Sequence, residues 1–270
     1  MLPLCNSLAD QRGIGSRFGV TMRTLLLAAT ALTVAGPALA ASPAPANQFS
    51  WTGCYLGVNA GPGWGDAAFS GSTTIAVTAS ESVHAGSGVG FLGGGQIGCN
   101  LQVARNWVLG AEGDFGWSTI SGTNRDPFFS GKNLSSRTDW ITSATGRVGY
   151  TWDNWMFYGK GGVAGTRDRY AFSATPVAFG GMIFFPGFNE TGADTRFGWT
   201  LGSGIEWAFA PAWSARIEFD YYGFGSRTLT LFDAATSTSS GPVSIKQNIE
   251  AIRFGINYQF WTGGSFLSGN

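Results

Sequence analysis

Three neighbouring residues carry groups that could act in hydrolysis: Ser82 as a nucleophile, with His84 and Glu81 beside it. A hydroxyl becomes a nucleophile when an adjacent imidazole removes its proton, and that step requires the two side chains to be held in a fixed geometry. His84 is the only histidine of the 270 residues, and it lies in a Gly- and Ser-rich segment without a regular pattern. A solvated loop is therefore the favoured interpretation, with catalysis as the alternative.

Patterns that could hold a cofactor are weak. The glycine string Gly93–Gly95 lacks the Gly-Lys-Ser/Thr end of a phosphate-binding loop and lies within a strand-like segment. Cys54 and Cys99 have no histidine nearby that could complete a metal site. We therefore expect no cofactor and no metal ion.

The charged residues follow a more informative pattern. Between Trp213 and Tyr222, the residues Arg216, Glu218 and Asp220 alternate with apolar ones. Successive side chains of a strand point to opposite faces, so this segment is a strand with one apolar and one ionic face. The same alternation recurs along most of the chain, and the charged residues of its ionic faces are Glu112, Asp114, Arg147, Lys160, Glu206, Arg216, Glu218, Asp220 and Arg253. Acids and bases nearly balance, so buried ionic faces would form a paired network.

Eight such segments, in four pairs, must position these side chains. Short turns at 104–106, 153–154 and 210–212 alternate with long polar loops at 62–88, 119–138, 167–196 and 225–248. Short turns at one end and long loops at the other are typical of an outer-membrane barrel, on its periplasmic and extracellular sides respectively. We predict an all-β fold, an eight-stranded antiparallel transmembrane up-and-down β-barrel with four long extracellular loops. The predicted strands are 52–61, 89–103, 107–118, 139–151, 155–166, 197–209, 213–224 and 249–260.

Aromatic residues mark the ends of the apolar rows. Trp107 and Trp117 are ten residues apart, which corresponds to about 25 Å along the axis of a barrel with strands tilted by about 40°. Trp140 and Tyr150 repeat the interval. This spacing matches the two aromatic girdles that flank a lipid-facing band. The predicted girdle residues are Trp107, Trp117, Trp140, Tyr150, Trp199, Trp207, Trp213 and Tyr221.

The composition favours an outward apolar face. Charged residues make up 12% of the chain, about half of the share usual for soluble domains, which is about 25%. The alternative is a soluble lipocalin-like barrel with an apolar interior, which would expose a Gly-rich, sparsely charged sheet to water. No apolar run after residue 40 is long enough for a spanning helix, so a membrane span must be β. The formal net charge of zero gives no support to nucleic-acid binding.

The N-terminal residues 1–40 have the outline of a secretory signal peptide. Arg23 precedes an apolar stretch, and Ala38-Leu39-Ala40 supplies a small-x-small cleavage pattern. A membrane anchor is the alternative, but the apolar run is shorter than the ~20 residues of a span. Residues 1–21 are an over-long n-region or follow a start codon placed too early, with Met22 as the expected start. Residues 41–50 read as a flexible leader, 51–260 as the barrel and 261–270 as a C-terminal tail.

The two cysteines that remain after cleavage occupy matching places in the first predicted hairpin. Cys54 lies near the start of the first strand and Cys99 near the end of the second, so an antiparallel pair brings them to the same level. A cross-strand disulfide is therefore expected in an oxidising compartment, with two buried thiols as the alternative.

Several motifs resemble those of a known family. They are Trp51-Thr-Gly-Cys-Tyr-Leu-Gly-Val-Asn-Ala-Gly, Gly93-Gly-Gly-Gln-Ile-Gly, Leu109-Gly-Ala-Glu-Gly-Asp, Gly146-Arg-Val-Gly-Tyr and Arg216-Ile-Glu-Phe-Asp-Tyr. Over residues 51–260 the chain is similar to the alphaproteobacterial OmpA-like barrel proteins, the 25–31 kDa surface-protein and porin-family group. The resemblance implies a monomeric barrel in the Gram-negative outer membrane and no catalytic residues. It also implies an assembly signal at Phe260, although ten residues follow it here.

We therefore expect a structural or surface-interaction protein of the cell envelope whose lumen is plugged by the charged network. A narrow porin-like channel is one alternative, and a lipid-modifying barrel enzyme is another. The expected partners are outer-membrane lipids, lipopolysaccharide and the barrel-assembly machinery, with no nucleic acid. The third long loop is rich in apolar residues, including Phe172 and Phe188. It is expected to pack on the neighbouring loops, with a docking patch for a partner as the alternative.

Overall fold

The computed structural model describes residues 49–70, 83–84, 88–125, 132–179, 182–185, 187–234 and 237–262. The chain divides into two units, Met1–Ala46 and Asn47–Asn270, and the described residues belong to the second. The expected signal peptide, most of the leader and most of the C-terminal tail lie outside the described residues.

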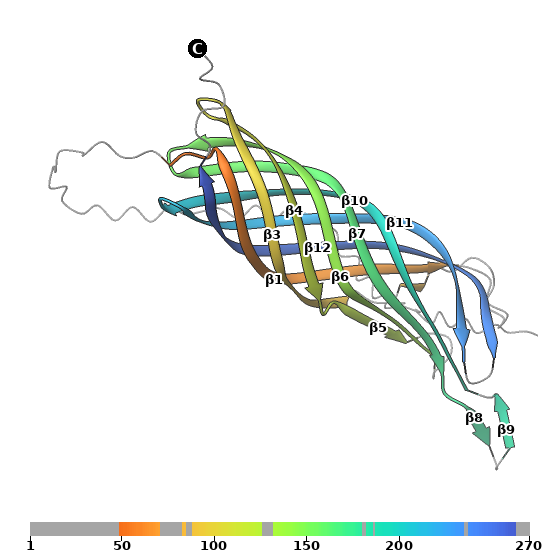
Figure 1. Cartoon of the computed structure of the whole chain (residues 1–270). Helices are drawn as coiled ribbons and strands as arrows, with labels where there is room; N and C mark the ends of the chain where they lie inside the picture. The colour runs from red at the N-terminus through yellow and green to blue at the C-terminus, as the bar shows by residue number, and fades with distance from the viewer. Residues whose placement is uncertain are drawn as a thin grey trace, which may run out of the picture. The chain divides into compact units, whose positions relative to one another are not determined.

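Within the described part, eight long antiparallel strands form a closed ring (Figure 1). Each pairs with the next long strand along the chain, and the first and last pair with each other. They are β1 (Gly53–Ser70), β3 (Gly88–Ala104), β4 (Trp107–Ser118), β6 (Lys132–Trp152), β7 (Trp155–Ala174), β10 (Phe188–Ala210), β11 (Trp213–Asp233) and β12 (Thr238–Thr262). The predicted all-β antiparallel barrel is confirmed.

In the described ranges, four short strands accompany the ring. The strand β2 (Val83–His84) pairs with β1, and β5 (Ser121–Arg125) pairs with β6 and β3, while β8 (Val177–Phe179) and β9 (Met182–Phe185) pair with each other. Among the described residues, no helix has the length and apolar character needed to cross a membrane.

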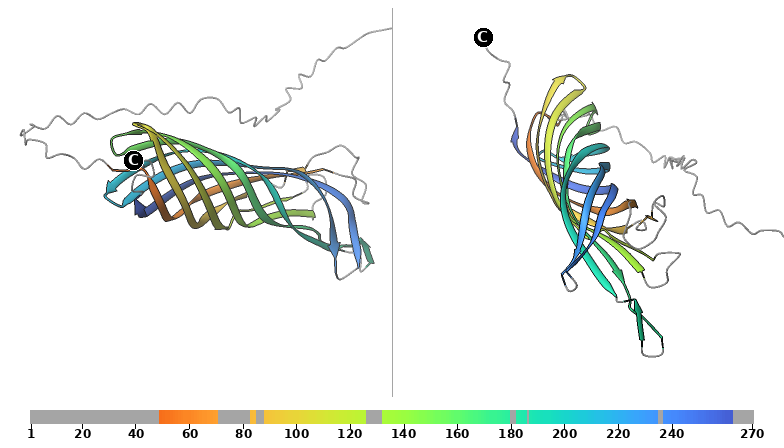
Figure 2. Two further views of the ribbon diagram at one scale, coloured as in Figure 1. Left: turned by 45° about the horizontal axis from the view of Figure 1, so that its top comes forward. Right: turned by 90° about the vertical axis from the view of Figure 1, so that its right-hand side faces the viewer.

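The register of the ring sets the tilt of its strands (Figure 2). A path perpendicular to the strands leaves β1 at Leu56 and returns to β1 at Asp66, ten residues further on. It passes through Ile97, Gly113, Ala144, Val163, Trp199, Gly223 and Asn248. With ordinary strand spacings, this stagger gives a tilt of about 41° and a backbone radius of about 8 Å. A ring this narrow has an interior that side chains can fill.

The apolar rows point outward and the ionic rows inward. On β11 the outward Trp213, Ile217 and Phe219 are 42–44% exposed, whereas the inward Arg216 and Glu218 are at most 4% exposed. Exposed aliphatic and aromatic side chains cover the outside of the other long strands in the same way. An apolar outer wall without strand edges is what a bilayer requires, so the alternative of a soluble barrel with an apolar interior is wrong.

Six of the eight long strands continue well beyond their predicted extracellular ends, whereas β3 and β4 keep close to their predicted bounds, so most of the predicted long loops were wrong in part. The alternation persists there, but the two faces exchange character. Along β12 the outward Phe254 is replaced further out by Lys246, while the inward Arg253 is replaced by Ile249 and Ile245. Beyond the membrane the outer face meets water and the inner face holds an apolar core. Extensions of the long strands and the short strand β5 occupy 62–70, 121–125, 132–138, 167–174, 188–196, 225–233 and 238–248 of the predicted loops, and β2, β8 and β9 also lie within those loops.

Candidate functional site: the charged interior of the barrel

The structure brings all nine predicted charged residues together inside the ring. Each is at most 5% exposed, and each side chain follows from the inward parity of its strand. The strands β4, β6, β7, β10, β11 and β12 contribute them, so no single hairpin could form the network. The network consists of Glu112, Asp114, Arg147, Lys160, Glu206, Arg216, Glu218, Asp220 and Arg253.

Glu112 is the centre of the network. Its carboxylate accepts a hydrogen bond from Arg216 Nη1, another from Tyr55 Oη at 2.6 Å, and a longer one from Lys160 Nζ at 3.4 Å. Arg147 Nη1 lies 3.8 Å from the same carboxylate. Because β4 and β11 lie four strands apart in the ring of eight, the Glu112–Arg216 pair spans the full width of the barrel.

A second group of contacts surrounds Arg253. Its guanidinium donates to Asp114 at 3.0 Å, to Glu218 at 3.0 Å and to Asp220 at 2.7 Å. Lys160 Nζ lies 2.7 Å from Glu218 and 3.2 Å from Asp220. These shared carboxylates connect Arg253 to Lys160 and, through Lys160, to Glu112.

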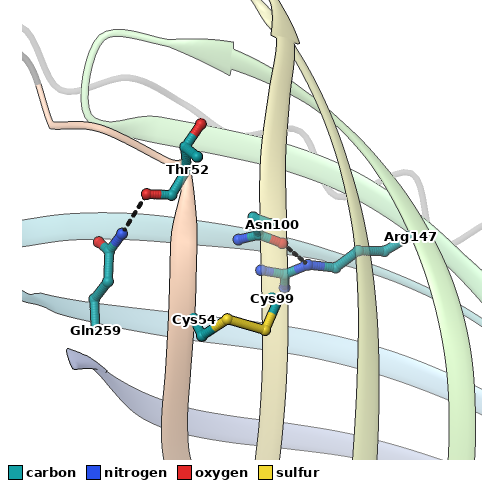
Figure 3. Close-up of a disulfide and its surroundings, with 6 residues drawn as sticks. All are labelled: Thr52, Cys54, Cys99, Asn100, Arg147 and Gln259. Atoms are coloured by element: carbon teal, nitrogen blue, oxygen red, sulfur yellow. Dashed lines mark hydrogen bonds between the residues drawn. A yellow bond between two sulfur atoms is a disulfide. The ribbon is translucent and has the colours of Figure 1, made fainter. Parts of the chain in front are cut away.

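Polar side chains extend the network toward the periplasmic turns. Glu206 accepts from Arg147 at 3.2 Å, from Ser214 at 2.5 Å and from Asn257 at 2.8 Å. Asn257 in turn accepts from Gln96 at 2.7 Å. Arg147 Nε also donates to Asn100 at 2.8 Å, from β6 to β3 (Figure 3). The contacts therefore continue around the ring as well as across it.

The network holds five carboxylates and four cations, all buried. Taking such groups out of water costs several kcal/mol per ion, and only close pairing with further hydrogen bonds recovers that cost. Each carboxylate contacts at least one cation within 3.2 Å. The arrangement is therefore a closely paired, nearly neutral network inside the ring.

Apolar layers close the network at both ends. The lower cluster, on the side of the periplasmic turns, consists of Trp51, Val108, Met156, Tyr158 and Ala208. The upper cluster consists of Leu92, Ile120, Ile141, Ala164, Tyr222, Phe224, Ile249 and Ala251. Their order is visible along the inward row of β7, where Met156, Lys160 and Ala164 follow one another. Sequence reasoning did not find either layer, because their members are spread over most strands.

A second buried polar group lies beyond the upper cluster, at residues predicted to be loop. Asp168 Oδ1 accepts hydrogen bonds from Thr138 at 2.7 Å and from Gln247 at 2.8 Å. Arg196 Nε lies 3.9 Å from Asp168 Oδ2. Burial raises the pKa of Asp168, opposed by these hydrogen bonds and by Arg196. The signal in the sequence was the inward row Thr166, Asp168, Tyr170, which continues the alternation of β7.

The two cysteines form a disulfide on the outward face, between β1 and β3 (Figure 3). Cys54 and Cys99 are directly opposite each other in the register, with an S–S distance of 2.05 Å. The bond links the first and second long strands covalently near the periplasmic end of the barrel. Cys99 directly precedes Asn100, which accepts the hydrogen bond from Arg147.

The predicted girdle residues lie on the outer surface as two belts. Near the periplasmic turns, Trp107 packs edge-on against Tyr150, with ring centroids 5.5 Å apart. Trp207 belongs to the same belt and stacks on Trp155, with ring centroids 5.7 Å apart. Trp213 also belongs to it and packs on Tyr258, with ring centroids 4.9 Å apart. At the extracellular side of the band lie Trp117, Trp140, Trp199 and Tyr221, with Trp199 and Tyr221 5.2 Å apart.

The remaining predicted residues form no site in the described part of the chain. Glu81 and Ser82 lie outside the described residues, and His84 is placed in β2 by its backbone alone. Phe172 of the third loop packs against Phe188, with centroids 4.9 Å apart, and against the outer cluster of Ala67, Tyr170, Leu231, Val243 and Ile245. Phe260 lies within β12, which continues to Thr262. No group of three or more His, Cys, Asp or Glu in the described ranges could hold a metal ion.

Comparisons with known proteins agree with this architecture. The family model described as outer membrane protein beta-barrel domain matches residues 25–260. The 31 kDa outer-membrane immunogenic protein of Brucella melitensis is 33% identical over 257 residues, which cover 88% of this chain and 100% of the relative. The 25 kDa outer-membrane immunogenic protein of Brucella abortus is 28% identical over 225 residues, which cover 81% and 84%.

Among solved structures, Neisserial surface protein A matches with a TM-score of 0.40 and 11% identity, over 77% of this chain and 98% of that one. The family match and the Brucella relatives confirm the resemblance noted from the motifs. The chain therefore belongs to the outer membrane protein β-barrel family and resides in the outer membrane.

Proposed function

We propose that the barrel is a non-conducting structural protein of the outer membrane, with a surface-interaction role for its extracellular strands. The observation that carries the proposal is the Glu112–Arg216 ion pair, which spans the ring between opposite strands. With Lys160 and Arg147 beside it, the pair leaves no wide path for solute at that level. The lower and upper clusters add an apolar barrier on each side.

The narrow ring supports the same proposal. A backbone radius of about 8 Å leaves room for side chains but for little else. A wet pore would also need its charged lining to contact water, whereas the side chains of Glu112 and Arg216 are fully buried. The rival function, a porin-like channel, requires these groups to move apart.

The test is planar-bilayer recording of the purified, refolded protein. We expect no stable conductance from the native barrel. The double variant Glu112→Ala/Arg216→Ala removes the pair across the ring and should raise the ion conductance, whereas Lys246→Ala on the outward face of β12 should not. A heat-modifiability gel checks that each variant is folded. Stable conductance of the native protein, with a selectivity altered by Arg147→Gln, would establish the channel instead.

The surface role rests on the extracellular extension of the strands. Both Brucella relatives are named as immunogenic outer-membrane proteins. In this chain, β7, β11 and β12 continue far beyond the aromatic belt and, together with β1, carry a buried cluster of their own. We propose that this extension presents a folded surface to the exterior, on a monomer that the barrel-assembly machinery inserts among outer-membrane lipids and lipopolysaccharide. Binding of surface-specific antibodies to intact cells tests the exposure, and analytical ultracentrifugation in detergent tests the monomer.

The enzyme alternative has a separate test. If the barrel modified lipids through His84, the variant His84→Ala would change the lipid A mass profile of the cell. We expect an unchanged profile.

A further inference from the structure

Three arginines gather on the outward face of β6 and β7, just beyond the extracellular aromatic belt. They are Arg137 on β6 with Arg167 and Arg169 on β7, here called the arginine patch. Arg137 is directly opposite Arg169 in the register, and Arg167 is directly opposite Trp140 of the belt. The side chains of Arg137 and Arg169 are 62% and 64% exposed, and Arg167 is also exposed.

One carboxylate partly neutralises the patch. Asp139 lies 2.7 Å from Arg169 Nε and 3.6 Å from Arg137 Nε. It occupies the register shift between Thr138 and Trp140, where a β-bulge turns its side chain toward the arginines. Within the described part of the chain, Arg167 has no ion-pair partner. Three cations and one carboxylate leave the patch with a formal charge of +2.

Such a surplus is costly without a counter-charge. Like charges directly opposite each other on neighbouring strands are destabilising, and Arg137 and Arg169 are such a pair. The periplasmic turns show no equivalent: their described charged residues are one base, Arg105, and one acid, Asp153. The surplus positive charge of the patch therefore has no counterpart at the periplasmic turns.

The height of the patch identifies what it meets. Aromatic belts lie at the level where acyl chains give way to headgroups. Arg167 is level with Trp140 in the register, and Arg169 lies about 5 Å further out along the axis at a tilt of about 41°. Guanidinium groups bind phosphate oxygens through paired hydrogen bonds, and they do so more specifically than ammonium groups.

We propose that the arginine patch binds the phosphate groups of a phosphorylated glycolipid in the outer leaflet. Arg167 and Arg169 hold the phosphate, while Trp140 and the neighbouring Trp117 contact the proximal parts of the acyl chains. The proposal does not depend on whether the lumen conducts, since every residue in it faces outward.

The test measures binding of the full barrel to phosphatidylcholine vesicles containing diphosphoryl lipid A, followed by tryptophan fluorescence. Each basic residue near an anionic lipid surface contributes about 1 kcal/mol, a factor of about 5, so Arg167→Gln/Arg169→Gln should weaken binding about 25-fold. Arg105→Gln on a periplasmic turn is the matched control and should bind as the native protein does. Arg167→Lys/Arg169→Lys should fall between, because it keeps the charge and loses the paired geometry.

Three outcomes would overturn the proposal. Arg167→Gln/Arg169→Gln could bind the phosphorylated lipid with native affinity. The native barrel could bind dephosphorylated lipid A equally well, which would leave only acyl-chain contact. Inorganic phosphate could displace the lipid at concentrations close to that of the lipid itself, which would indicate a site for free phosphate. A heat-modifiability gel confirms the fold of each variant, and these exposed substitutions should leave it intact.

Discussion

The buried network makes a quantitative prediction about Arg253, whose replacement by methionine keeps the length of the side chain and removes its charge. Arg253 contacts Asp114 at 3.0 Å, Glu218 at 3.0 Å and Asp220 at 2.6 Å, with its side chain 3% exposed. At an effective dielectric constant of about 20, the Coulomb attraction of each pair is about 6 kcal/mol before desolvation. Desolvation offsets much of this, but removing one partner leaves the carboxylates buried and uncompensated, at a cost of about 3–5 kcal/mol.

The assay is equilibrium unfolding by urea in lipid vesicles, followed by tryptophan fluorescence, on the native protein and Arg253→Met. The matched control is Arg137→Met, because Arg137 is also paired with a carboxylate but is 62% exposed. Exposed pairs contribute about 0–1 kcal/mol, so the control should unfold nearly as the native protein does.

A second variant separates electrostatics from packing. Adding Asp220→Asn to Arg253→Met removes one of the stranded carboxylates, so the double variant should be more stable than the sum of the two single losses by about 0.5–3 kcal/mol. If Arg253→Met costs less than about 1 kcal/mol, or if the two losses simply add, the carboxylates are not held by Arg253 and the description of the barrel interior as a paired network is wrong.

Three further predictions concern other parts of the barrel. Burial raises the pKa of Asp168, so the folded state binds the proton of this carboxyl more tightly than the unfolded state does. The free energy of unfolding should therefore fall as the pH rises from the ordinary aspartate range through the raised pKa. Urea titrations at a series of pH values should show this fall for the native protein and not for Asp168→Asn. The Cys54–Cys99 disulfide closes a loop with a sequence separation of 45. The double variant Cys54→Ser/Cys99→Ser should therefore lower the free energy of unfolding by up to about 4 kcal/mol. Equal stability of the native barrel with and without reductant would contradict this prediction. A Cβ at Gly162 would lie 2.0 Å from the carbonyl oxygen of Ala144, whereas a Cβ at Gly146 would meet nothing within 4 Å. Gly162→Ala should therefore lower the free energy of unfolding by about 1–3 kcal/mol, and Gly146→Ala should be tolerated. The temperature at which each variant loses its heat-modifiable migration on a gel measures the difference.

The membrane-spanning part of the fold followed directly from the sequence. Within the bilayer, the outside of each strand must be apolar and the inside can be polar, so period-two alternation located β4 at its observed bounds, Trp107–Ser118. Parity alone then assigned residues such as Glu112 and Arg253 to the interior. Beyond the belt the alternation continues with its faces exchanged, since the outside becomes polar and the inside apolar at positions such as Lys246 and Ile245, and these strands were therefore not predicted.

The partners within the network could not be predicted. Which cation meets Glu112 depends on the ten-residue stagger of the closed ring, and stagger follows from register at every interface together. Arg216 is 104 residues away in the chain and four strands away in the ring. The apolar layers were missed for the same reason, since members such as Leu92 and Ile249 come together only after closure.

The pairing of β1 with β12 also constrains how the protein can be made. Seven of the eight interfaces in the ring join long strands that follow one another in the chain, so they can form as hairpins in the order of synthesis. The eighth joins the first and last long strands of the ring and cannot form before β12 has been exported. Until that seam closes, β1 and β12 present unpaired amide and carbonyl groups that a bilayer does not tolerate. A chain truncated before β12 would remain an open sheet. Only a chain that includes β12 can therefore form a barrel that is stable in the bilayer.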